Sequence, residues 1–166
     1  MIDRVIRAAT LASAIGSGMM AALLLTFSIF VMRALGRLPS AQGIAKMQSL
    51  NVAILNPLFG LAFMGTTVSC LFLLVTAPST AHQPASVGRT AGALLFLIGT
   101  IAVTFVINVP LNNALAKLNP TSIQAAKYWA HYRAHWTAWN HIRAVAATGA
   151  AVTLALAFRS LVRTAH

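Results

Sequence analysis

Long stretches without any charged residue constrain this chain more than any other feature. They run from Ala8 to Met32, from about Leu50 to Val75, from Thr90 to Ala116 and from Ala144 to Phe158. About 20 apolar residues are needed to cross the roughly 30 Å of hydrocarbon in a bilayer. The fourth stretch reaches only about 22 Å at 1.5 Å per residue, so its crossing must include Arg143, Arg159 or both. We therefore predict four membrane-spanning helices, at about 8–32, 50–75, 91–115 and 139–160.

The composition excludes several classes of protein. Only 8% of the residues are charged, and Lys+Arg 12 against Asp+Glu 1 gives a net charge of +11. The basic residues lie singly between apolar stretches, which is typical of membrane flanks and predicts no nucleic-acid partner. Asp3 is the only acid, so paired-carboxylate catalysis and carboxylate cages for Mg²⁺ or Ca²⁺ are excluded within one chain. Cys70 is the only cysteine, which excludes an internal disulfide and dithiol exchange.

These features predict an all-α fold: a single integral membrane domain, residues 1–166, folded as a four-helix bundle with short loops. An even number of spans places both termini on the same side of the membrane. The first apolar segment is too long for a signal peptide and is expected to stay in the mature protein. We expect an integral membrane protein located in a bacterial-type inner or plasma membrane. Its expected partner is the lipid bilayer. Basic residues flank both ends of the predicted spans, so the orientation stays open.

Small residues and turn residues indicate how the spans pack and connect. Ala12, Gly16 and Met20 in the first span, and Gly88 and Gly92 in the third, have the spacing that allows close helix contact or a homo-oligomer face.

The connections carry their own signals. Residues 36–49 are expected to form one turn of surface helix, and residues 77–88 a plain loop. Asn119 and Pro120 end the third helix, and Thr121 with Gln124 predicts a capping box for the last one.

A polar stripe runs along the third span. Thr100, Thr104, Asn108 and Asn112 recur every four residues, and Pro110 lies between the two asparagines. Pro110 lacks an N–H, so a kink or loosened turn is expected near Val106. The asparagines either repair that kink and bond neighbouring helices, or they line a polar cavity.

The last helix carries an aromatic row that ends in a cation. Trp129, Tyr132, Trp136, Trp139 and Arg143 are spaced 3, 4, 3 and 4 residues apart, so they share one helix face. The row is either an interface anchor with bundle packing, or one wall of a pocket for a planar, electron-rich, anionic ligand.

Arg143 has no carboxylate close in sequence, since Asp3 is at the other end of the chain. It must snorkel to water, bond carbonyls and asparagines, or hold an external anion.

Three histidines lie on the same helix. His131 and His135 have the i, i+4 spacing of two metal ligands, but no third ligand is evident, so no metal site is assigned. His141, beside Asn140, suits a hydrogen-bonded core residue, a general base or an axial haem ligand.

Several motifs together resemble the anthrone oxygenase-like integral membrane family. The residues that carry the resemblance are Phe27–Ser28, Val31 to Leu35, Met47–Gln48, Asn51, Asn56–Pro57, Thr104, Asn108-Val109-Pro110-Leu111-Asn112, Tyr132, Trp136 and Trp139-Asn140-His141-Ile142-Arg143. Arg33 departs from the pattern, since many relatives have proline there. The resemblance implies oxidation of an apolar, aromatic or enolisable small molecule, such as a polyketide anthrone, by O₂ without an established cofactor.

The resemblance also implies roles for individual residues. His141 is the candidate base, and Arg143 with Asn108, Asn112 and Asn140 the candidate oxyanion stabilisers. Substrate contacts are expected from Trp136, Trp139, Tyr132, Thr104 and Asn51. Two alternatives remain: a redox protein that holds haem or copper through His141, and a non-enzymatic membrane protein that packs or binds small molecules.

Overall fold

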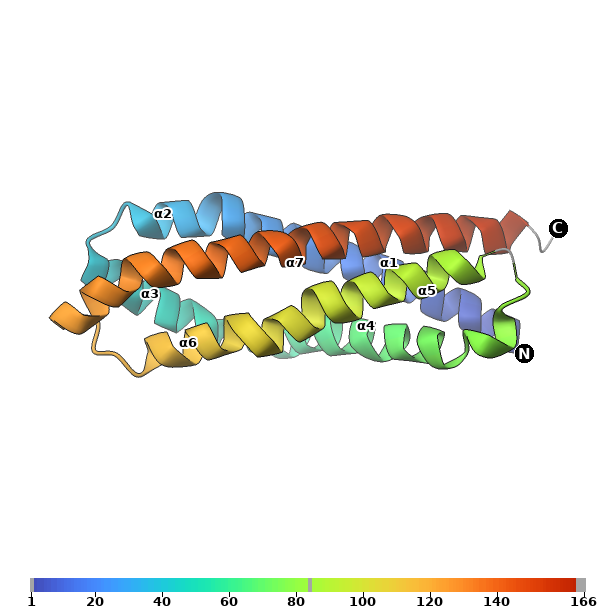
Figure 1. The fold of residues 1–166 in the computed structure, drawn as a ribbon, viewed down its shortest axis with the longest axis horizontal. Helices are drawn as coiled ribbons and strands as arrows, with labels where there is room; N and C mark the ends of the chain where they lie inside the picture. The colour runs from blue at the N-terminus through green and yellow to red at the C-terminus, as the bar shows by residue number, and fades with distance from the viewer. Residues whose placement is uncertain (1, 84, 164–166) are drawn as a thin grey trace.

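The computed structural model describes residues 2–83 and 85–163, and this part of the chain is helical throughout, with short connections and no strand (Figure 1). The α-helices are α1 Ile2–Thr26, α2 Met32–Gly36, α3 Ser40–Ala53, α4 Pro57–Val75, α5 Ser86–Phe96, α6 Val109–Ala116 and α7 Ile123–Arg163. Three π-helical segments, η1 Phe27–Val31, η3 Leu97–Ala102 and η4 Thr104–Asn108, join α1 to α2 and α5 to α6. A short 3₁₀ turn, η2 Pro78–Thr80, follows α4.

Four helical runs are long and apolar enough to cross a membrane: Ile2–Gly36, Pro57–Val75, Ser86–Ala116 and Ile123–Arg163. They lie lengthwise beside one another in an elongated bundle, which confirms the predicted fold class (Figure 1). Helix α7 passes through Arg143 without a break. The start of α1 and the end of α7 lie at the same end of the bundle (Figure 1). The exact residues within the bilayer stay a prediction.

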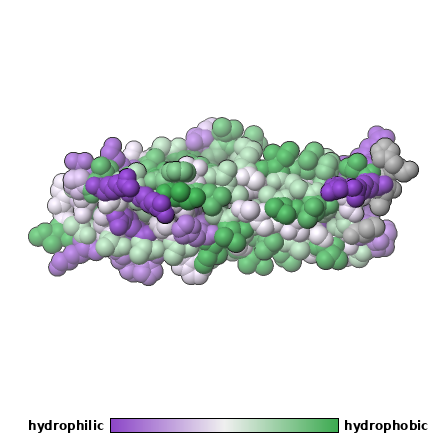
Figure 2. Space-filling model, turned by 90° about the horizontal axis from the view of Figure 1, so that it is seen from above, coloured by the Kyte–Doolittle hydropathy of each residue, from purple (hydrophilic) through white to green (hydrophobic). Residues whose placement is uncertain are grey.

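The outer surface of the bundle is apolar along its middle. Large side chains such as Phe30, Leu61 and Val145 are exposed, the last to 72%. Figure 2 shows hydrophilic residues gathered toward the two ends of one face and hydrophobic residues between them. This surface fits a lipid environment, so the chain is an integral membrane protein.

Glycines permit the close contacts between helices that the sequence predicted. A Cβ atom at Gly16 of α1 would overlap the hydroxyl of Thr66 on α4 and lie 3.0 Å from the Thr66 Cβ. A Cβ atom at Gly92 of α5 would lie 2.6 Å from the Cγ of Leu154 on α7. The helix backbones therefore approach one another where these residues have no side chain.

The segment between the first two spans is more ordered than predicted. In place of one surface turn it forms α3, a helix of 14 residues. Ile44 and Met47 of α3 are fully buried in a cluster with Leu35 and Trp129. The prediction of a surface turn was wrong because the residues that bury α3 are distant in sequence.

The start of α7 also differs from the prediction. The Ser122 hydroxyl accepts a hydrogen bond from the Ala125 N–H at 3.1 Å, while the Thr121 N–H donates to the Asn119 carboxamide. The predicted Thr121–Gln124 capping box is therefore wrong by one residue. The Asn119 turn occupies Thr121, so Ser122 caps the helix.

The loosened turn expected before Pro110 is the π-helical segment η4. The Val109 N–H donates to the Thr104 carbonyl, five residues earlier, in place of the usual four. The Thr104 hydroxyl in turn donates to the Thr100 carbonyl at 2.6 Å. A missing N–H and a shifted bonding pattern thus widen the helix over η4.

The first turns of α5 hold a buried arginine, which bonds the connection between α4 and α5. Arg89 is 2% exposed, and its guanidinium donates to the Gln83 side-chain oxygen at 2.8 Å and the Thr80 hydroxyl at 2.7 Å. Gln83 donates to the Asp3 carboxylate at 3.1 Å. This network ties the start of α1 to the start of α5, so the connection is not a plain loop.

Candidate functional site

A polar cluster lies inside the bundle, around the middle of α7. Its members are buried side chains from three helical runs, and we call it the Arg143 cluster: Ser28, Thr100, Asn108, Trp136, Asn140 and Arg143. Trp136, Asn140 and Arg143 follow one face of α7 over about 10 Å. The other three members come from the runs that pack against this face.

Asn140 joins α7 to the first helical run. Its carboxamide nitrogen donates to the Leu24 carbonyl and to the Ser28 hydroxyl, both at 2.7 Å. Its oxygen accepts a hydrogen bond from the Arg143 Nη1 at 3.1 Å. Asn140 thereby holds the guanidinium in place without neutralising it.

Arg143 is a buried cation without a counter-ion. Its side chain is 6% exposed, so it does not snorkel to water. Its Nε has no hydrogen-bond partner among the residues that the structure describes. The only acid in the sequence, Asp3, bonds Gln83 at the end of the bundle where α1 begins. A guanidinium in such a position is costly unless an anion or a strong acceptor joins it.

Two more unpartnered polar atoms belong to the same cluster. Within the described part of the chain, the Trp136 indole Nε1 and the Asn108 Oδ1 are buried without a hydrogen-bond partner. The Asn108 nitrogen donates to the Trp136 carbonyl at 3.3 Å, and the Trp136 ring lies 5.9 Å from the Phe27 ring. The cluster thus has two unpartnered N–H donors, Arg143 Nε and Trp136 Nε1, together with an aromatic face and the positive charge of Arg143.

Each π-helical segment contributes one residue to this cluster. Ser28 lies in η1, Thr100 in η3 and Asn108 in η4, and all three segments contact α7. The Thr100 hydroxyl donates to the Arg143 carbonyl at 3.3 Å. Single π-helical turns within α-helices are frequent at functional sites, because they re-aim side chains at the cost of regular bonding. Their convergence on one stretch of α7 marks it as the candidate site.

A second buried network lies two turns earlier on α7, and we call it the Tyr132 network. The Tyr132 hydroxyl donates to the Asn112 Oδ1 at 2.8 Å, and the Asn51 side chain also bonds Tyr132. Trp129 stacks on the Tyr132 ring at a centroid distance of 5.6 Å. This network ties α3 and α6 to α7 and does not reach Arg143.

The two asparagines of the third run contact the last helix, but at different places from those predicted. The family resemblance implied that both act together with Asn140 and Arg143, so we expected them near residues 140–143. The structure instead pairs Asn108 with Trp136 and Asn112 with Tyr132, one and two turns earlier. Neither side chain repairs the carbonyl left by Pro110. Thr104 is half-buried and bonds its own helix.

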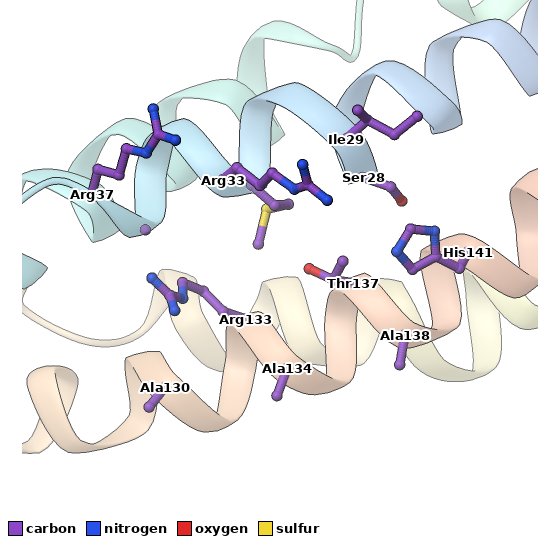
Figure 3. Close-up of a pocket in the computed structure, with 12 residues that line it drawn as sticks. Ser28, Ile29, Arg33, Arg37, Ala130, Arg133, Ala134, Thr137, Ala138 and His141 are labelled. Carbon is purple, nitrogen blue, oxygen red and sulfur yellow. The ribbon is translucent and has the colours of Figure 1, made fainter.

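His141 lies on the other side of α7 from Arg143. It is exposed and lines an open groove of about 650 Å³ between α2 and α7, together with Ser28, Met32, Arg33, Arg37 and Arg133 (Figure 3). We call this the α2–α7 groove. Trp139 is half-buried and is not hydrogen-bonded into the Arg143 cluster by any contact that the structure describes. The structure therefore separates His141 from Arg143, which the family resemblance had placed in one site.

Among the described residues, His131 and His135 have no third candidate metal ligand beside them. The His131 and His135 rings stack with centroids 3.9 Å apart, and the His135 Nδ1 lies 3.0 Å from the His131 carbonyl. Over residues 2–83 and 85–163 no group of three His, Cys, Asp or Glu side chains could hold a metal ion. The haem or copper alternative through His141 stays a prediction.

The sequence analysis did not select two members of the cluster, Ser28 and Thr100. Thr100 belongs to the polar stripe of the third span, so its four-residue spacing from Thr104 and Asn108 could have identified it. Ser28 is a small polar residue in an apolar span, which is typical of a hydrogen bond between membrane helices. Its partner, Asn140, is 112 residues away, so no local pattern identifies the pair.

Comparison with family models gives one match. Residues 55–153 match the family described as anthrone oxygenase, and this range is more than half of the chain. It includes Asn108, Asn112, Trp136, Asn140 and Arg143. Searches of curated proteins and of solved structures found no match. Since the matched range contains most of the Arg143 cluster, two of the four long apolar helices and most of a third, the chain belongs to the anthrone oxygenase family.

Proposed function

We propose that this protein is a membrane-embedded oxygenase that binds an apolar, enolisable aromatic ketone of the anthrone type at the Arg143 cluster, where O₂ oxidises it. The observation that carries the proposal is the buried Arg143 guanidinium, which the chain supplies with no carboxylate. The expected location is a membrane of the bacterial inner or plasma membrane type.

The unpartnered atoms of the cluster define the ligand chemistry. Arg143 Nε and Trp136 Nε1 are N–H donors, which suit an oxygen atom that carries negative charge, and Asn108 Oδ1 is an acceptor. The rings of Trp136 and Phe27 lie 5.9 Å apart and suit a flat aromatic body. An enolate of a tricyclic ketone combines these two properties.

The proposed chemistry needs no electron donor besides the substrate. Loss of one proton from the central CH₂ gives the enolate, whose oxyanion Arg143 and Trp136 stabilise. The carbanion carbon then forms a bond to O₂, and the resulting hydroperoxide loses water as the O–O bond breaks and a second C=O forms. The sum is anthrone + O₂ → anthraquinone + H₂O. The CH₂ carbon is oxidised to a ketone, and the second oxygen atom leaves in water.

A general base at His141 stays a prediction. This imidazole opens to the α2–α7 groove, whereas the Arg143 side chain, two residues further along α7, is buried in the bundle. A buried cation at the oxyanion increases the acidity of the substrate CH₂ and so reduces the strength of base that the reaction needs. The proposal therefore rests on Arg143 and Trp136 rather than on His141.

The membrane setting also supports an apolar substrate. The outer surface of the bundle is apolar along its middle, and both a polycyclic ketone and O₂ concentrate in lipid. Such a substrate reaches the bundle laterally, from the bilayer.

Turnover in lipid tests the proposal. The protein in nanodiscs is supplied with anthrone in air-saturated buffer, and anthraquinone is followed by its absorbance while O₂ consumption is measured. We expect a rate well above that of protein-free nanodiscs, with equal amounts of O₂ used and quinone formed. Arg143→Gln and Trp136→Phe should lower that rate at least tenfold, and Arg163→Gln, which removes an exposed charge near the end of α7, should not.

Three results would overturn the proposal. Equal rates with and without protein would remove the oxygenase. Binding of anthrone without turnover would favour the non-enzymatic alternative. A Soret band or stoichiometric copper in the purified protein, lost in His141→Ala, would favour the cofactor alternative.

A further inference from the structure

We propose that the α2–α7 groove binds the phosphate headgroup of an anionic phospholipid, with the acyl chains lying along the apolar surface beside His141. This site shares only Ser28 with the Arg143 cluster and does not rest on the proposed oxidation. Three arginines and one histidine line the groove, and no acid does.

The cations come from two helical segments that border the groove. Arg33 lies on α2 and Arg37 directly follows that helix, while Arg133 and His141 lie on the facing stretch of α7 (Figure 3). The one acidic side chain of the sequence, Asp3, bonds Gln83 at the other end of the bundle. Positive charges that line one groove without a carboxylate repel one another, and a bound anion relieves that repulsion.

Arg133 is held in place before any ligand arrives. Its guanidinium lies against Gly36 of α2, where an added Cβ would overlap Nη1 and lie 2.9 Å from Cζ. The same guanidinium carbon lies 5.9 Å from the centroid of the Trp129 ring. A cation fixed by an aromatic face and by a close backbone contact loses less entropy on binding a phosphate than a free surface arginine does.

The groove lies where the basic end of the bundle meets its apolar middle. Beyond Arg33, toward the middle, Ile29 lines the groove and Phe30 is 68% exposed. On α7, Ile142 and Val145 are exposed just past His141. Figure 2 shows the same order on the face that it draws, hydrophilic residues near each end and hydrophobic ones next to them.

This order matches an amphiphile better than a free anion. A phospholipid places its phosphate among the arginines and its chains on the apolar side chains that follow. An inorganic phosphate would use only the charged part of a groove that occupies about 650 Å³. We therefore commit to the lipid as the occupant.

Lipid selectivity of the purified protein tests this site. The protein in neutral detergent is titrated with phosphatidylglycerol, phosphatidylcholine or inorganic phosphate, and bound lipid is counted by native mass spectrometry. We expect phosphatidylglycerol to bind at least tenfold more tightly than phosphatidylcholine. The triple variant Arg33→Gln, Arg37→Gln, Arg133→Gln should lose this preference.

A matched triple variant separates this groove from the general positive charge. Arg4→Gln, Arg7→Gln, Arg159→Gln removes the same charge near the ends of α1 and α7 and should keep the preference. Gly36→Ala keeps every charge but displaces the Arg133 guanidinium, and should weaken phosphatidylglycerol binding several-fold. Gly36→Ala therefore tests the groove even if the triple variant fails to fold.

Three outcomes would overturn the assignment. Equal loss in both triple variants would show a general charge effect. Competition of inorganic phosphate at the affinity of the lipid would show a site for free anions. Equal binding of the two lipids by the wild-type protein would show no headgroup site.

Discussion

The Arg143 guanidinium donates to the Asn140 carboxamide at 3.1 Å, so the nearest partner of this buried cation is a neutral side chain one turn earlier on α7. The Asn140 side-chain nitrogen donates its hydrogen bonds to the Leu24 carbonyl and the Ser28 hydroxyl. The pair therefore positions a positive charge inside the bundle and leaves that charge available to a ligand.

Replacing the neutral partner with a carboxylate should close the site. Asn140→Asp gives Arg143 an internal counter-ion, so we expect a tricyclic anion such as anthracene-9-carboxylate to bind at least tenfold more weakly. Ligand fluorescence measures the affinity, and gel filtration confirms the fold. Asn113→Asp is the control, because Asn113 is exposed on α6. Unchanged affinity in Asn140→Asp would separate the ligand from this pair.

The Tyr132 network should contribute to stability. Tyr132→Phe removes the hydroxyl that donates to Asn112 and leaves the Oδ1 of this half-buried side chain without that donor. We expect a loss of about 1–2 kcal/mol in the free energy of unfolding, measured by titration with sodium dodecyl sulfate. Tyr128→Phe, at a half-buried ring on the same helix, should cost less than half as much. Equal losses would contradict a role for the Asn112 bond.

The contact between α1 and α4 depends on a glycine. Gly16→Ala forces a methyl group onto Thr66, so we expect it to destabilise the protein by about 1–3 kcal/mol. Gly60→Ala on α4 meets open space and should be neutral or slightly stabilising. Adding Thr66→Ala to Gly16→Ala should recover part of the loss. If the double variant is no more stable than Gly16→Ala, steric overlap is not the cause.

The buried Arg89 should stabilise the end of the bundle that holds the start of α1. Arg89→Gln removes bonds to Gln83 and Thr80, and we expect a loss of about 2 kcal/mol in the same titration. Arg4→Gln removes an exposed charge from that end and should cost little. Hydrogen exchange should increase first in residues 77–88 of the Arg89 variant.

The sequence predicted the buried face of α7 well. The 3–4 spacing placed Trp129, Tyr132, Trp136 and Arg143 on one face, and all four are buried. It failed at the fourth residue of the row, Trp139, which is half-buried, whereas the adjacent Asn140 is buried. The face drifts around the helix, and spacing does not show which of two adjacent residues the neighbouring helices cover.

Other features could not be read from the sequence because their causes are distant in the chain. Only η4 had a local signal, Pro110, whereas η1 and η3 have none. Helix α3 is buried by Leu35 and Trp129, which no local pattern connects to it. The two-residue spacing of His141 and Arg143 puts them on different faces of a helix. No local pattern shows that His141 lines a groove together with residues of α2.

The most direct test of the account compares two single charge removals on α7. Arg143→Leu and Arg163→Leu each remove one positive charge, but Arg143 is buried in the cluster and Arg163 is exposed near the end of the helix. The measurement is the affinity for anthracene-9-carboxylate, with neutral anthracene as the reference. We predict that Arg143→Leu loses a charge-assisted contact worth about 1.5–3 kcal/mol, and so about ten- to a hundredfold in affinity for the anion but not for anthracene. Arg163→Leu should bind both as the wild type does. Equal affinities for the anion in the two variants would contradict the account, because Arg143 would then hold no ligand.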